Sequence, residues 1–260
     1  MTIYNEPKTI AAILFDMDGT LYTNHEWVQY QIDTLVKKLA ETRSTSYEKM
    51  QEEVAEYRKN WADSHQGKQI SLSTVLKAYG ISIAQSVKWR EELYEPALYL
   101  KPDAKLRETL LNLKMRYKLA VVTNNPVLIA RKTLKALGVE SCIQIIVGLD
   151  TCMETKPHPA PYLEAAKLCE TPTETCISVG DRYDIDIALP LTLGMGGILV
   201  DGVEDVYELA EKWVGGLTCR SQFSGNAPFN KFDHTRNNSI KENARSLRWE
   251  IKSRGAVSLV

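Results

Sequence analysis

The chain has 260 residues, of which 44% are hydrophobic and 25% charged, enough for a full core and a smaller second domain. A formal net charge of -1 gives no general attraction to nucleic acid or to a membrane surface. No apolar stretch is long enough to span a bilayer, and the first residues, which include Glu6 and Lys8, lack the layout of a secretory signal. Five cysteines, odd in number and without metal-ligand spacing, indicate reduced thiols. We therefore expect a cytoplasmic protein with neither a nucleic-acid nor a membrane partner.

The first predicted element is an apolar strand that begins at Ala12 and runs into Asp16, Asp18 and Gly19. On an extended backbone the two carboxylates, two residues apart, leave on the same side. A hard cation bound through oxygen would offset their charge, and Gly19 would allow a sharp turn. The alternative is an ordinary Asp-x-Asp-Gly surface turn, which would not explain the buried strand that leads into it.

Helical periodicity follows in residues 22–96. Trp27, Ile32, Leu35, Val36 and Leu39 predict one helix. Thr45 and Glu48 resemble a capping box that begins a second, and a third is predicted to stop at Gly80. A fourth lies near residues 89–93, before Pro96. The sequence thus predicts an all-helical insertion directly after the acidic strand end.

From Pro102 onward, predicted helices and strands alternate, which indicates parallel strands joined by right-handed crossovers. Strands are expected at residues 119–122, 143–147, 177–179 and 197–200. Polar residues follow the strand or crossover ends: Thr123 with Asn124, then Lys156, then Asp181. Ligands of open parallel sheets bind outside the carboxyl ends of the strands, so these groups should converge with Asp16 and Asp18. The predicted fold class is α/β.

The last segment, residues 218–260, departs from this pattern. It holds eight Lys or Arg residues against three Asp or Glu residues. Residues 221–238 lack periodicity and are interpreted as linker, whereas Ser239 and Glu242 would cap a short amphipathic helix with a basic outer face. We expect a basic tail, partly disordered, outside the catalytic unit.

The polar residues at the strand ends suit phosphoryl transfer. Lys156 and Thr123 would hold phosphate oxygens, Mg²⁺ bridging the carboxylates would neutralise charge, and one carboxylate would attack phosphorus. Each residue alone has an ordinary structural explanation, such as a helix N-cap for Asp181. Their order and placement at successive strand ends give the prediction its weight.

Residues 10–212 resemble the haloacid dehalogenase-like hydrolases that carry a helical cap after their first motif. The four motifs of that family match Phe15-Asp16-Met17-Asp18-Gly19-Thr20, Val122-Thr123-Asn124, Lys156-Pro157, and Gly180-Asp181 with Asp186. The resemblance implies a Rossmann-like core formed by residues 1–21 and 97–217, with residues 22–96 as the helical cap.

The resemblance also implies roles for individual residues. Asp16 would form a covalent aspartyl-phosphate, and Asp18 would protonate the leaving oxygen and later activate water. Mg²⁺ would be held by the Asp16 side chain, the Asp18 backbone carbonyl and the Asp181 side chain, with Asp186 in support. Asp184 competes with Asp186 for that last role.

The second aspartate, Asp18, favours a phosphatase over a dehalogenase within the family. Lys156-Pro157-His158-Pro159 with a small helical cap is similar to the phosphoglycolate phosphatases, so the expected substrate is a small phosphate ester. Alternatives of the same fold are a nucleoside 5'-monophosphate phosphatase and a sugar-phosphate mutase. A non-catalytic, phosphate-binding regulatory module is a further alternative. His25, near the start of the insertion, is one candidate for substrate contact.

Overall fold

The computed structural model describes residues 1–214, so the predicted basic tail at 218–260 lies outside the described residues. Six strands form one sheet in the order β1-β6-β5-β2-β3-β4. Their bounds are β1 Thr2–Tyr4, β2 Ala12–Phe15, β3 Lys118–Val122, β4 Ile145–Val147, β5 Cys176–Gly180 and β6 Gly196–Leu199. Every pairing is parallel except the edge pair β1–β6, which is antiparallel. This confirms the predicted α/β fold with a parallel sheet.

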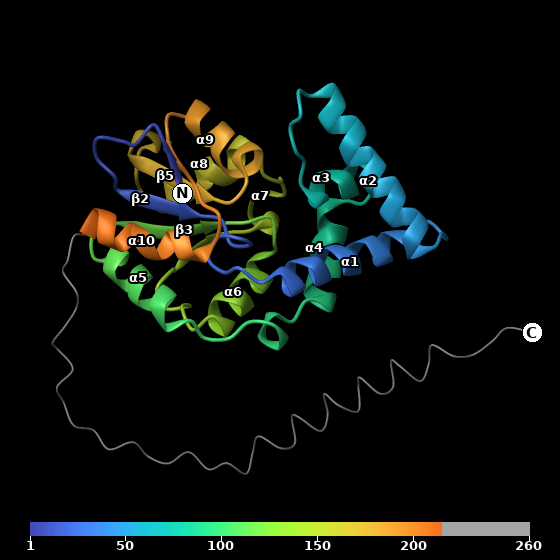
Figure 1. Cartoon of the computed structure of the whole chain (residues 1–260), viewed down its shortest axis with the longest axis horizontal. Helices are drawn as coiled ribbons and strands as arrows, with labels where there is room; N and C mark the ends of the chain where they lie inside the picture. Colours follow the sequence, from blue (N-terminus) through green and yellow to red (C-terminus); the bar gives the residue numbers. More distant parts are fainter. Residues whose placement is uncertain (215–260) are drawn as a thin grey trace, which may run out of the picture. The chain divides into compact units, whose positions relative to one another are not determined.

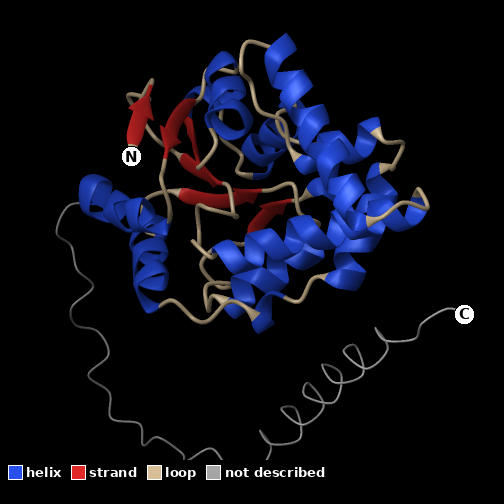
Figure 2. Cartoon of the chain, turned by 45° about the vertical axis from the view of Figure 1, so that its right-hand side comes forward, coloured by secondary structure: helices blue, strands red, loops and turns tan. Residues whose placement is uncertain are grey.

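Helices cover both faces of the sheet (Figures 1 and 2). The helices that follow the insertion are α5 Ala104–Lys114, α6 Val127–Ala136, α7 Leu149–Cys152, α8 Pro159–Leu168, α9 Ala188–Thr192 and α10 Val203–Val214. Short turns of other helix types are η1 Pro96–Leu98, η2 Thr173–Thr175 and the π-type η3 Tyr183–Ile187.

The strand β2 shows why two layers form. Ile13 and Phe15 pack on one face with α5, α6 and α10, whereas Ala12 and Leu14 pack on the other face with α8. All four side chains are buried, as expected for a central strand covered on both sides. β2 thus ends in the middle of the sheet, where its carboxyl end is flanked by those of β3 and β5.

The insertion between β2 and α5 contains α1 His25–Thr42, α2 Tyr47–Ser64, α3 Leu72–Ala78 and α4 Ile83–Leu93. Each helix begins at a residue whose side chain accepts a backbone N–H: Asn24, Ser46, Ser71 and Ser82. Buried Trp27 at the start of α1 contacts Tyr94, just after α4, with ring centroids 5.5 Å apart. The two ends of the insertion are therefore packed together. The division into a core and a separate cap domain stays a prediction.

Two local features differ from the sequence-based expectations. The N-cap of α2 is Ser46 and not Thr45, because the Ser46 hydroxyl accepts the Lys49 N–H at 3.2 Å. The edge strand β1 was not predicted, since three residues carry too little periodicity to be recognised. No helix within residues 1–214 is both long and apolar enough to cross a membrane.

Candidate active site

The residues predicted at the strand ends lie at the same edge of the sheet. Asp16 follows β2, Thr123 follows β3 and Asp181 follows β5, and these three strands are neighbours. Lys156, in the loop between α7 and α8, reaches the same edge and contacts Asp16. Residues far apart in the sequence are thus brought together by the parallel order of the strands.

Lys156 lies between two carboxylates. Its ammonium nitrogen Nζ is 2.5 Å from Asp16 Oδ1 and 2.7 Å from Asp186 Oδ1. All three side chains are at least 95% buried, so these charges attract one another with little screening by water. Burial nevertheless raises the pKa of the Asp16 carboxyl to about 7, because Asp186 and Asp181 add repulsion and Lys156 offsets only part of the shift. The Lys156 ammonium is therefore insufficient to keep the pKa of Asp16 at its ordinary value.

Asp16, Asp181 and Asp186 each offer a carboxylate oxygen, and these oxygens lie within 4.8 Å of one another. Asp16 Oδ2 and Asp181 Oδ1 are buried and accept no hydrogen bond from the described chain. The guanidinium nitrogen Nε of Arg182 lies 3.7 Å from Asp181 Oδ1. Burial raises the pKa of Asp181 to about 6, against the opposing effect of Arg182. Clustered oxygens without donors are what a hard divalent cation requires, so these residues fit Mg²⁺.

Two glycines allow this close packing of carboxylates. Gly19 has φ +74°, and a Cβ atom there would lie 2.5 Å from Asp181 Oδ2. A Cβ atom on Gly180 would lie 2.3 Å from the Cβ of Asp186. Both positions therefore require glycine, one of them also for its left-handed backbone.

The choice between Asp184 and Asp186 follows from where η3 points each side chain. Asp186 is buried against Lys156, and its Oδ2 accepts the Arg182 N–H at 3.2 Å. Its backbone carbonyl accepts the Ser178 hydroxyl at 2.7 Å, which fixes η3 to β5. Asp184 turns the other way, and its Oδ2 accepts the backbone N–H of Gln69. Asp186, and not Asp184, belongs to the carboxylate group.

Thr123 and Asn124 serve the local structure of the site. The buried Thr123 hydroxyl accepts the Asn125 N–H at 3.1 Å, which shapes the turn after β3. Asn124 Oδ1 accepts the Lys156 N–H at 2.7 Å, and its Nδ2 donates to the Lys156 carbonyl at 3.3 Å. This paired contact fixes the loop that carries Lys156.

Asp18 has a different set of neighbours from Asp16. Its Oδ1 accepts hydrogen bonds from the Tyr22 hydroxyl and from Gln31 Nε2, the latter at 2.8 Å. Its Oδ2 accepts a bond from Asn125 Nδ2 at 2.9 Å, and Asn125 also donates to Gln31 Oε1 at 3.1 Å. The structure thus separates the two aspartates that the sequence placed on one side of a strand. β2 ends at Phe15, before either of them.

Tyr22, Gln31 and Asn125 were not singled out from the sequence. Asn125 adjoins a predicted residue, and its amide would have been a reasonable addition. Gln31 lies on α1, 13 positions after Asp18, at a helix position where a polar residue reads as solvent-exposed, although it is 8% exposed. Only the packing of α1 against the strand ends reveals its contact.

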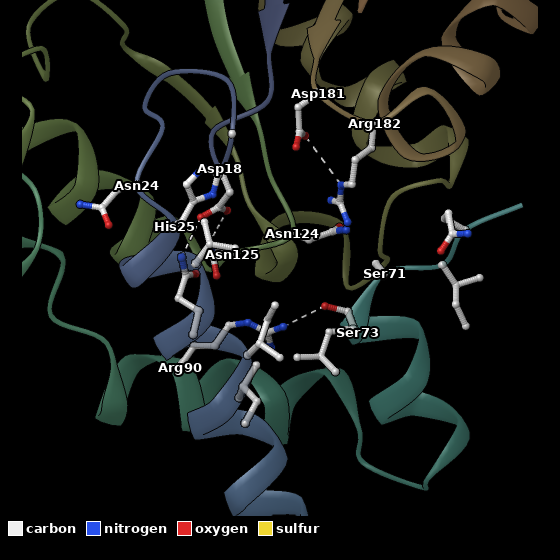
Figure 3. Close-up of a pocket in the computed structure, with 18 of the residues that line it drawn as sticks. Asp18, Asn24, His25, Ser71, Ser73, Arg90, Asn124, Asn125, Asp181 and Arg182 are labelled. Atoms are coloured by element: carbon white, nitrogen blue, oxygen red, sulfur yellow. Dashed lines mark hydrogen bonds and ion pairs between the residues drawn. The ribbon is translucent and has the colours of Figure 1, made fainter. Parts of the chain in front are cut away.

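A pocket of about 470 Å³ opens between this edge of the sheet and the insertion (Figure 3). Asp18, Asn124, Asn125, Asp181 and Arg182 line it from the sheet side. The insertion contributes polar, apolar and basic side chains, and His25, an exposed residue, is among them. The volume is in the range of small-molecule sites.

The comparisons with known proteins agree with this geometry. A model of the haloacid dehalogenase-like hydrolase family matches residues 10–189. A phosphoglycolate phosphatase from Aquifex aeolicus is 31% identical over 178 residues, which cover 67% of this chain and 77% of that protein. One from Colwellia psychrerythraea is 31% identical over 112 residues, 42% of this chain and 50% of that protein, so this match spans half the relative's length.

The fold itself is similar to the crystal structure of a HAD phosphatase from Thermococcus onnurineus. The TM-score is 0.56 at 21% identity, and the alignment covers 80% of this chain and all of that one. The family match takes in Asp16, Thr123, Lys156 and the loop after β5, the residues that the fold brings together. The chain belongs to the haloacid dehalogenase-like hydrolase family.

Proposed function

We propose that this protein is a Mg²⁺-dependent phosphatase that hydrolyses a small phosphate monoester through an aspartyl-phosphate on Asp16. The observation that carries the proposal is the state of the Asp16 carboxylate. Lys156 binds and orients Oδ1, while Oδ2 is buried without a hydrogen-bond partner in the described chain. A carboxylate that is oriented through one oxygen, while its other oxygen accepts no hydrogen bond, is prepared for attack on phosphorus.

The side chains of Asp16 and Asp181 and the backbone carbonyl of Asp18 would hold Mg²⁺. Asp186 would support the site through its contacts with Lys156 and with the Arg182 N–H. Mg²⁺ would supply charge neutralisation, which lets an anionic nucleophile approach an anionic phosphate. Lys156 contributes to the same effect as the only lysine or arginine side chain that ion-pairs with Asp16 in the described chain.

The chemistry at the protein's own residues has two steps. An oxygen of Asp16 attacks phosphorus, the bond from phosphorus to the ester oxygen breaks, and Asp18 gives a proton to the leaving oxygen. Asp18 then takes a proton from water, the water oxygen attacks the aspartyl-phosphate, and inorganic phosphate leaves with Asp16 regenerated. Thr123 and Asn124, next to Asp16 and Lys156, would bind phosphate oxygens through the turn after β3.

For the substrate, the proposal is a compound of the phosphoglycolate class. Relatives named phosphoglycolate phosphatase match both over most of the chain and over shorter stretches. The insertion contributes two arginines and several polar side chains to the pocket, beside apolar ones, and these basic and polar groups suit a small anionic ester. The proposed location is cytoplasmic, and the proposed partner is this small molecule, with no nucleic acid or membrane involved.

The test is release of inorganic phosphate in the presence of Mg²⁺. The panel contains 2-phosphoglycolate, other small esters, nucleoside 5'-monophosphates, and glucose 1-phosphate with a trace of its bisphosphate. Phosphate release by the wild type and none by Asp16→Asn would support the proposal. Formation of glucose 6-phosphate faster than free phosphate would identify a mutase instead. No turnover of any compound would favour the phosphate-binding regulatory module.

A further inference from the structure

 The helical insertion, residues 22–96, holds ten Lys or Arg residues and eleven Asp or Glu residues. Of these charged residues, only Arg58 on α2 and Arg90 on α4 line the pocket. The carboxylates that line it, Asp18, Asp181 and Asp201, all lie outside the four helices. The helical side of the pocket is therefore positively charged.

Arg90 is a buried cation without an anionic partner. It is 4% exposed, and no carboxylate oxygen of the described chain lies within 4.0 Å of its guanidinium nitrogens. Its hydrogen bonds go to neutral acceptors, the hydroxyl and carbonyl of Ser86 and the Ser73 hydroxyl, the last at 2.9 Å (Figure 3). These bonds satisfy N–H groups but bring no negative charge to the guanidinium, and the favourable charge of Asp18 acts on Arg90 only from beyond ion-pair distance.

Arg58 is the second such group. Its Nε is buried and has no hydrogen-bond partner in the described chain. No carboxylate of the described chain lies within 4.0 Å of the Arg58 guanidinium nitrogens. Burial lowers the pKa of Arg58, and the positive charge of Arg182 lowers it further. The guanidinium groups of Arg58 and Arg182, which both line the pocket, therefore repel each other, and an anion bound beside Arg58 would relieve this repulsion.

We propose that Arg58 and Arg90 form a site for a second anionic group, a carboxylate or a second phosphate, on the part of the substrate remote from the reacting phosphate. This inference rests on the proposed phosphatase function and narrows its substrate class. The reacting phosphate lies at the sheet edge with Asp16 and Lys156, and the remote anion lies on the helical side. An ester with an uncharged tail lacks the group that these arginines bind.

The test measures binding with phosphonates, which are not hydrolysed, in the presence of Mg²⁺. Phosphonoacetate, 3-phosphonopropionate and 1,2-ethylenediphosphonate carry a second anion. Ethylphosphonate and propylphosphonate replace the carboxylate of the first two by a methyl group. Calorimetric titration of the full-length protein gives the ratio of affinities within each pair, and the diphosphonate is compared with propylphosphonate.

We expect at least one compound with a second anion to bind about tenfold more tightly than its neutral partner, as for a charge-assisted contact worth about 1.4 kcal/mol. This ratio should fall toward one in Arg58→Met and in Arg90→Met. Lys59→Met, at an exposed position next to Arg58 that does not line the pocket, is the matched control and should keep the wild-type ratio. If Arg90→Met does not fold because Arg90 is buried, the comparison rests on Arg58→Met, at a half-buried position.

Equal affinities within every pair for the wild type would overturn the inference, as would ratios that survive both arginine substitutions. Absence of binding by all five phosphonates would overturn it as well. The proposed phosphatase is judged separately, by phosphate release from the ester panel. Release without any preference for a second anion would leave the phosphatase standing and remove the arginine site.

Discussion

Gln31 of α1 donates a hydrogen bond from Nε2 to Asp18 Oδ1 at 2.8 Å, joining the helical insertion to the proposed acid-base residue. Tyr22 and Asn125 complete the contacts of that carboxylate. All three contacts come from hydrogen-bond donors, and together they fix the position of the Asp18 side chain. Movement of α1 would change the surroundings of Asp18 directly.

Replacing Gln31 by Leu should lower turnover by about tenfold for alkyl phosphates, because a hydrogen bond to a charged group contributes about 1.5 kcal/mol. The loss should be smaller for p-nitrophenyl phosphate, whose leaving group needs little protonation. Steady-state kinetics on both substrates gives the comparison. Gln29→Leu, at an exposed position on the same helix, is the control. Equal losses of turnover on the two substrates would show that Gln31 does not act through proton transfer by Asp18.

Removing the charge of Asp16 should stabilise the metal-free protein in a pH-dependent way. The folded-state pKa of about 7 lies above the ordinary value of 3.8, so ionisation of Asp16 destabilises the fold progressively as pH rises from about 4 to about 7. The advantage of Asp16→Asn over the wild type should therefore grow across that range and level off above it. Urea unfolding of both proteins in a chelator, at a series of pH values, measures the difference. A difference that is independent of pH would contradict the prediction.

Lys156→Met should abolish activity and destabilise the fold by about 3 kcal/mol at pH 8, because removing one partner strands two buried carboxylates. At low pH the cost should shrink as Asp16 becomes protonated. Lys118→Met breaks an exposed ion pair with Glu170 and should cost less than about 1 kcal/mol. Denaturant unfolding of the two variants provides the comparison, and similar costs would show that Lys156 is not essential to the buried group.

Much of the fold was predictable because its signals are local. The apolar run into Asp16 and the alternation of helices and strands from Pro102 specify buried parallel strands, and parallel order brings their ends together. The predicted N-cap of α2, Thr45, lies one position before the actual N-cap, Ser46, because threonine and serine are both good N-cap residues.

The contacts between the insertion and the sheet edge were not predictable in the same way. Gln31, Arg58 and Arg90 lie on three helices, and their roles depend on which helix face meets the strand ends. In sequence they read as ordinary polar positions of amphipathic helices. Only tertiary packing leaves Arg90 buried without a carboxylate and puts Gln31 against Asp18.

The proposed metal dependence rests on the clustered oxygens of Asp16, Asp181 and Asp186. A chelator should abolish phosphate release and Mg²⁺ should restore it. Ca²⁺ should restore little, because its longer and looser coordination would misplace the attacking carboxylate. Thermal unfolding should show Mg²⁺ raising the Tm of the wild type more than that of Asp181→Asn. Full activity of metal-stripped protein would contradict this prediction.

The central claim is that Asp16 carries the phosphoryl group between the two steps. The most direct measurement is acid quenching of the wild-type protein during turnover with Mg²⁺ and its best phosphate ester, followed by mass spectrometry of the peptide that contains Asp16. The account predicts one added phosphoryl group on Asp16, and none on the same peptide of Asp16→Asn treated in parallel. Rapid turnover with a phosphoryl group on another residue, or hydrolysis by Asp16→Asn at the wild-type rate, would contradict it.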